Sequence, residues 1–182
     1  SQSLSLSNLT LREEILKLTS QKESIHSQIA NQLEKLKSLD HERIATHYLK
    51  AKNNNKAKVH FKKAAQHFEQ ITDLLKAAEC YQKAANLGQN EEGLALKACD
   101  LLIQSGLHQE ALVFLTACEL KKSKRSLSRF GQIHFKLRDL NQAKEIFEEA
   151  LTLKSNSDFE ELHLQNQLAN TFLHLGNTEE AK

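Results

Sequence analysis

Nine histidines and three cysteines are the side chains of this sequence with the most obvious capacity for chemistry. Histidine serves as a general base or a metal ligand near neutral pH, and cysteine serves as a nucleophile or a zinc ligand. Their spacing fits none of these roles, because the sequence has no His-Glu-x-x-His, Cys-x-x-Cys or Gly-x-Ser-x-Gly segment. We therefore expect no catalytic residue, no metal and no cofactor, and we predict that the chain is not an enzyme.

The same residue types fit structural roles. Cys80, Cys99 and Cys118 fall at positions suited to small apolar side chains, and an odd number of cysteines argues against a disulfide framework. We expect buried, reduced thiols and a cytoplasmic location. His134 occupies a position where an aromatic side chain would pack. Adjacent carboxylates such as Glu148 and Glu149 point to different sides of a helix, so they do not form an acid–base pair.

The composition indicates that helices carry all of these residues. The 182-residue chain contains no proline, tryptophan or methionine and only five glycines, and its formal net charge is +2. Few helix breakers and no alternating apolar pattern predict an all-α protein. No apolar run reaches the roughly 18 residues that a membrane helix needs, and no signal-peptide pattern begins the sequence.

A repeated pattern of small and bulky residues organises these helices. Ala143-x-x-x-Phe147-x-x-Ala150 is echoed at Ala77, Ala111 and Ala181, with separations of 34, 32 and 38 residues. Alanine at helix contacts lets two helices approach closely, and short turns make neighbouring helices antiparallel. We therefore predict helices at about 41–52, 56–71, 74–87, 92–105, 108–121, 124–138, 141–154, 159–175 and from 178 onward.

The sequence before residue 41 has a different pattern. We predict a disordered serine-rich start at 1–8, a helical segment at 9–40 and a helical array at 41–182 that the end of the chain truncates. In the helical segment, apolar residues including Leu18 and Ile25 form one stripe, and 19–21 suggests a break. Such a stripe fits packing against the array, and a coiled coil is the alternative.

The period near 34 and these residue types resemble tetratricopeptide repeats. The resemblance implies a right-handed α-solenoid whose first helices line a concave groove for a protein or peptide. Family members that clamp a carboxylate use five positions of this groove. The repeat register places these positions at Lys62, Gln66, Lys97, Arg125 and Arg129. Lys62, Arg125 and Arg129 agree with the family pattern, whereas Gln66 and Lys97 stand where asparagine is usual.

A second resemblance concerns the first half of the chain. The segments 25–33 and 44–51, the asparagines at 53–55 and the Ala77-x-x-x-Tyr81 helix are similar to the helical-repeat arm of STAND-type signalling ATPases. That family includes LuxR-type regulators and some adenylate cyclases and kinases. The resemblance implies a sensor or regulatory arm, although the sequence contains no GxxxxGK[ST] phosphate loop.

The charges are distributed unevenly. The stretches 43–68 and 121–138 contain basic residues and no acidic ones. A solvated surface is the simplest interpretation, and a basic groove for an acidic segment is the functional one. We expect a non-catalytic protein- or peptide-binding scaffold. The alternatives are a nucleic-acid-binding repeat, which few aromatic residues make less favourable, and a regulatory fragment of an enzyme whose catalytic domain lies elsewhere.

Overall fold

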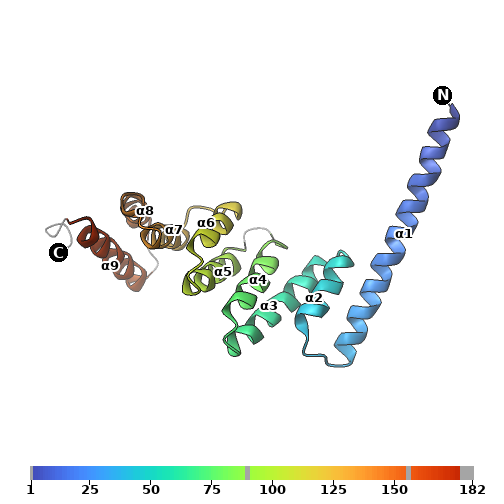
Figure 1. Cartoon of the computed structure of the whole chain (residues 1–182), viewed down its shortest axis with the longest axis horizontal. Helices are drawn as coiled ribbons and strands as arrows, with labels where there is room; N and C mark the ends of the chain where they lie inside the picture. Colours follow the sequence, from blue (N-terminus) through green and yellow to red (C-terminus); the bar gives the residue numbers. More distant parts are fainter. Residues whose placement is uncertain (1, 89–90, 155–156, 177–182) are drawn as a thin grey trace.

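The computed structural model describes residues 2–88, 91–154 and 157–176, and the side chains of residue 14 and of residues 16 onward within them. Every regular element in the described residues is an α-helix. Figure 1 shows one long helix followed by an extended array of shorter ones. The helices are α1 (Gln2–Lys35), α2 (His41–Lys50), α3 (Asn54–Gln70), α4 (Leu74–Ala85), α5 (Glu92–Gln104), α6 (His108–Ala117), α7 (Lys124–Lys136), α8 (Leu140–Thr152) and α9 (Asp158–Leu175).

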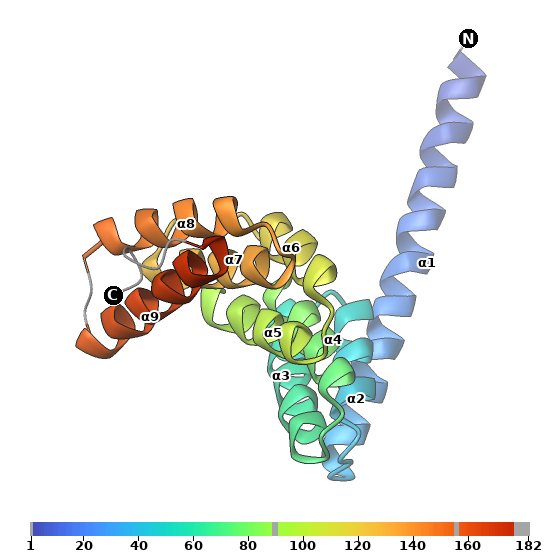
Figure 2. The same ribbon diagram turned by 60° about the vertical axis from the view of Figure 1, so that its left-hand side comes forward.

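These helices confirm the predicted fold class. Eight predicted helices of the array begin and end within a few residues of α2 to α9, and the expected helix from 178 lies outside the described residues. Successive helices pack as antiparallel hairpins, and the array curves away from α1 in both views (Figures 1 and 2). The repeated alanines sit at the helix contacts, since Ala77, Ala111 and Ala143 are completely buried.

Short turns connect the hairpins by a common device. The second residue after the helix adopts a left-handed conformation, and the next residue caps the following helix. Lys52, Thr72 and Arg138 have φ values of 57°, 60° and 66°. The side chains of Asn53, Asp73 and Asp139 then accept hydrogen bonds from the backbone three residues ahead. In the first of these turns Lys52, rather than an asparagine of 53–55, takes the left-handed conformation, and Asn53 serves as the cap of α3.

The array has two apolar cores that share α7. One extends from α1 to Ile133 and includes Tyr48, Phe61 and Leu115. The other contains Leu127, Ala143, Phe147, Ala150 and Leu164. The three cysteines are free, and burial raises the pKa of Cys80 to about 11 and that of Cys99 to about 12. These thiols therefore stay protonated at neutral pH and act as core side chains.

α1 differs from the sequence prediction. It runs without a break through 19–21, and it includes the 2–8 segment that we expected to be disordered. Only its final turns contact the array, where Ala30 is buried. The N-terminal half projects into solvent (Figures 1 and 2), and Leu18 is 58% exposed. The prediction that this part of the helix packs against the repeats is therefore wrong. The predicted division into 1–8, 9–40 and 41–182 stays a prediction.

A polar network joins α1 to α2 and α3. The Tyr48 hydroxyl lies 2.5 Å from Glu34 Oε2 and 2.8 Å from Asn31 Oδ1, and Lys56 donates to it at 3.0 Å. The Nε2 atom of His60 lies 2.7 Å from Glu34 Oε1. Because a carboxylate only accepts, His60 must donate through Nε2. Glu34 is thus the point at which α1 meets both neighbouring helices.

Candidate peptide-binding groove

The predicted groove positions lie on the first helix of successive hairpins, but the structure separates them. Arg125 and Arg129 line one pocket on α7, and Lys62 and Lys97 line another between α3 and α5. Gln66 is exposed on α3 and lines neither pocket. Four of the five residues therefore form two pairs rather than one cluster, Gln66 lies apart from both, and the role of all five in binding stays a prediction.

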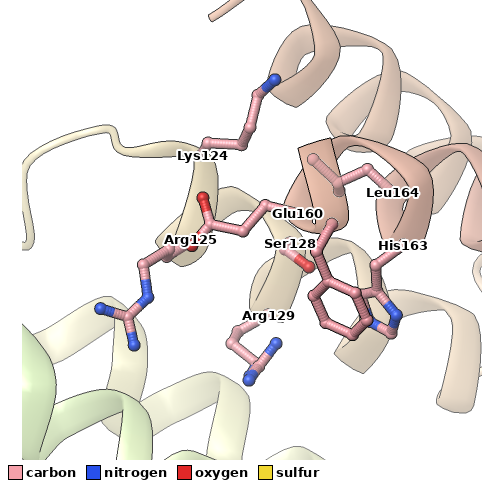
Figure 3. A pocket seen from close by; sticks show the side chains of 8 residues that line it. Lys124, Arg125, Ser128, Arg129, Glu160, His163 and Leu164 are labelled. Carbon is pink, nitrogen blue, oxygen red and sulfur yellow. The ribbon is translucent and has the colours of Figure 1, made fainter. Parts of the chain in front are cut away.

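The pocket of Arg125 and Arg129 has a volume of about 370 Å³ and lies between α7 and α9. Figure 3 shows the two arginines and Ser128 on α7, with Glu160, His163 and Leu164 on the facing helix. Helix α7 begins at a capping box formed by Ser123 and Ser126, which fixes the direction in which its first turns project. The lining residues are Lys124, Arg125, Ser128, Arg129, Phe159, Glu160, His163 and Leu164.

A second pocket of about 170 Å³ follows along the same two helices. Its lining includes three amide side chains, Gln132, Gln167 and Asn170, together with Phe135, Lys136 and Phe147. We call the two pockets together the α7/α9 groove. From Arg125 to Lys136 the helix advances roughly 16 Å, which matches about five residues of an extended peptide.

Most cations near the groove are already neutralised by carboxylates of the same chain. Lys124 is only 6% exposed, and its Nζ atom lies 3.0 Å from Glu161 Oε2 on α9. Arg129 donates to both oxygens of Asp100 on α5. Arg125 is exposed and has no ion pair within the described part of the chain. Among the three cations that line the first pocket, Arg125 is therefore the one available to a ligand, and Lys136 is the exposed cation of the second pocket.

Two buried polar atoms in the groove lack hydrogen-bond partners among the described residues. They are the Oγ atom of Ser128, whose side chain is 5% exposed, and Oε1 of Gln167. The amide nitrogen of Gln167 meets His163 Nε2 at 2.8 Å, and its oxygen is buried without a donor in a residue that lines the second pocket. A buried polar group without a partner costs about 1–3 kcal/mol, so a ligand that supplies the missing bonds gains that energy.

The pocket between α3 and α5 has a different electrostatic character. Its volume is about 620 Å³, and it includes Glu91 and Glu92 beside the two lysines. Lys97 binds Glu69 at 2.9 Å, and Glu69 also accepts a hydrogen bond from Tyr81 at 2.5 Å. Burial favours a raised pKa for Glu69, but these two hydrogen bonds hold it below its usual value. Glu69 therefore stays ionised and pairs with Lys97, which is then not available to a ligand.

Several basic residues of the stretches 43–68 and 121–138 likewise form ion pairs within the fold. Lys52, Lys56 and Lys58 pair with Glu23, Glu34 and Glu91. In the later stretch, Lys122 pairs with Glu149, and Lys124 and Arg129 pair as described above. The sequence does not reveal these pairs, because each joins residues that are distant along the chain. Ser128, Phe159, Glu160 and His163 were not predicted as site residues either, although the register of the last hairpin could have revealed them.

The described residues contain no group of three or more side chains arranged to hold a metal ion. Within the same residues, no helix combines the length and the apolar character needed to cross a membrane.

Comparisons with known proteins agree with this architecture. Residues 125–157, which include α7 and α8, match the model of the tetratricopeptide repeat family. No curated protein matches the chain. None of these comparisons supports the resemblance to STAND-type ATPases.

Several solved structures are similar in fold. Residues 41 to the end of MamA from Desulfovibrio magneticus RS-1 are 16% identical, with a TM-score of 0.59 over 88% of this chain and 89% of that one. YrrB, described as a TPR protein with an unusual peptide-binding site, is 20% identical, with a TM-score of 0.57 over 86% and 79%. The Cut9–Hcn1 complex of the APC/C contains a chain that is 18% identical, with a TM-score of 0.55 over 90% and 36%. These TM-scores show a shared fold, although the sequence identities are low.

Proposed function

We propose that this chain is a non-catalytic scaffold that binds an extended peptide segment of a partner protein in the α7/α9 groove. The observation that carries the proposal is the coincidence of an unpaired arginine, Arg125, with two partnerless buried polar atoms in one groove. Ser128 and Gln167 suit the hydrogen-bonding groups of a peptide backbone, and Phe159, which is 77% exposed, offers an apolar contact. The expected cytoplasmic location forms part of this proposal.

The charged groups that line the first pocket indicate how many acidic residues the ligand should carry. Because Lys124 and Arg129 are already paired and Glu160 lies in the same pocket, the first pocket does not present a broad positive surface, and Lys136 lies at the far end of the groove. Arg125 offers one planar fork for a carboxylate. We therefore propose a segment that carries one acidic residue beside neutral ones, rather than a long acidic tail.

Binding of fluorescent ten-residue peptides with no, one or several carboxylates tests this function by anisotropy. Arg125→Ala should weaken the best one-carboxylate peptide by about tenfold to a hundredfold, because a hydrogen bond to a charged group contributes roughly 1.5–3 kcal/mol. Ser128→Val should weaken binding of charged and neutral peptides alike, since the hydroxyl would serve the peptide backbone.

Arg138→Ala is the matched control. Arg138 is an exposed cation just beyond α7 that lines neither pocket of the groove, so its removal should leave the affinity unchanged. Equal effects of Arg125→Ala and Arg138→Ala would remove the groove from the mechanism. Failure of every peptide to bind would contradict the scaffold proposal itself.

The resemblance of 25–51 to the arm of signalling ATPases suggests a place for such a scaffold, and we propose that it regulates a larger signalling protein. This proposal rests on that resemblance alone. The gene sequence upstream of residue 1 tests it, because a phosphate-binding loop of the GxxxxGK[ST] type is required there. A different upstream domain would contradict it.

A further inference from the structure

The projecting part of α1 carries an apolar surface that its own chain does not cover. The side chains of residues 16–22 are all exposed, and Leu18 and Ile25 are 58% and 54% exposed. Both views show this part of α1 standing clear of the array (Figures 1 and 2). An isolated helix gains little stability from its own hydrogen bonds, so a long exposed one is normally stabilised by packing.

Some exposed apolar residues of α1 follow a heptad repeat. Leu18 and Ile25 are seven residues apart in one series, which Gln32 continues, and Lys22 and the half-buried Ile29 form a second series at the same spacing. The sequence continues both series upstream, with Leu4 and Leu11 in the first and Ile15 in the second. A repeat of seven with two apolar positions defines the contact line of a left-handed coiled coil. We call this line the α1 seam.

The α1 seam and the face that holds α1 to the array lie on different sides of the helix. Ala30 is completely buried against the array, and His26 contacts His47 of α2. At 100° per residue, the seam is centred about 110° around the helix from Ala30. A second helix can therefore occupy the seam without displacing α2.

The residue types along the seam indicate which helix fits. β-Branched residues in one series with leucine in the other favour a pair of parallel helices. A polar residue in the β-branched series fixes how the two helices align. Ile15 and Ile29 flank Lys22 in one series, while leucine predominates in the other. The described residues beside the seam include the uncharged Thr19, Gln21 and Gln28. Glu14 and Lys35 also lie beside it, but neither would face a like charge in a parallel identical helix.

We propose that α1 pairs with α1 of a second copy of this chain in a parallel, in-register, two-stranded coiled coil. The pairing is independent of what the α7/α9 groove binds. It would place two arrays at the same end of the coiled coil, so that a partner with two peptide segments could bind both grooves with increased avidity.

Sedimentation equilibrium of the whole 182-residue chain tests the proposal, with Leu18→Glu compared against Leu16→Glu. The two leucines are matched in exposure, at 58% and 61%, but Leu16 lies outside the seam. Leu18→Glu should raise the dimer Kd by about a hundredfold or more, because it puts two like charges in the contact line. Leu16→Glu should leave the Kd within about twofold.

The orientation is tested by cysteine cross-linking in a Cys118→Ser background. Lys22→Cys should form an intermolecular disulfide under mild oxidation, because identical seam positions face each other in a parallel pair. Ser20→Cys, on the opposite side of the helix, should not. A monomeric chain at all concentrations, equal effects of the two glutamates, or no cross-link at residue 22 would each overturn the proposal.

Discussion

Gly131 shows how closely two helices approach in this fold. It is buried in α7, and a Cβ atom built on it would lie 2.5 Å from Cε1 of the Phe147 ring on α8. Phe147 is itself only 1% exposed. The absent side chain of Gly131 therefore makes the room that the phenyl ring fills, and this contact anchors the helix hairpin that carries the α7/α9 groove.

Gly131→Ala should therefore destabilise the chain by about 1–3 kcal/mol, although alanine alone favours a helix. Gly93→Ala is the matched control, because Gly93 lies in α5 and a methyl group added to it would meet no atom within 4 Å. It should stabilise the chain by up to about 1 kcal/mol. Urea unfolding of both variants measures the difference, and a stabilising Gly131→Ala would contradict the packing argument.

At the scale of elements, histidine pairs connect α1, α2 and α3. The Nδ1 atoms of His26 and His47 are 3.0 Å apart, and those of His41 and His60 are 3.3 Å apart. Burial, followed by the neighbouring His60, Lys63 and His67, lowers the pKa of His41 despite the opposing effect of Asp40. Burial, followed by His26, Arg43 and Lys50, lowers the pKa of His47. Each contact between two Nδ1 atoms requires one donor and one acceptor.

The free energy of unfolding should fall as the pH decreases from about 7.5 to 5.5, because the unfolded chain binds protons at His41 and His47 more tightly than the folded chain does. The hydrogen bond from Tyr48 lowers the pKa of Glu34, so its contribution is lost only at lower pH. Combined His41→Gln and His47→Gln substitutions should flatten the decrease. His163→Gln, on α9, should not, and an unchanged slope in the double variant would contradict this origin.

At the scale of the whole molecule, the two cores make stability a local property. Phe61 belongs to the core that includes α2 to α5, and Phe147 belongs to the core of α7 to α9. Both rings are 1% exposed. In a solenoid each hairpin contacts mainly its neighbours, so damage at one end need not spread to the other.

Phe147→Ala should cost about 3–5 kcal/mol and accelerate amide hydrogen exchange mainly in α7 to α9. Phe61→Ala should have a similar cost but accelerate exchange mainly in α2 to α4. The two variants serve as controls for each other. Uniform acceleration along the whole chain in both would show that the array unfolds as a single cooperative unit.

The sequence alone determined the helices, the hairpin repeat and the fold class. Apolar periodicity, short turns and regularly spaced alanines are local properties, and they decide directly where helices form and how neighbouring helices pack. It also predicted that Arg125 and Arg129 share a surface. Only the tertiary structure decided which cations remain available: Asp100 and Glu69 neutralise Arg129 and Lys97 across helices that are distant in the sequence. It likewise separated the face of α1 that binds the array from the seam that stays exposed. Ion pairs and exposure depend on which helices become neighbours, and spacing along one helix does not contain that information.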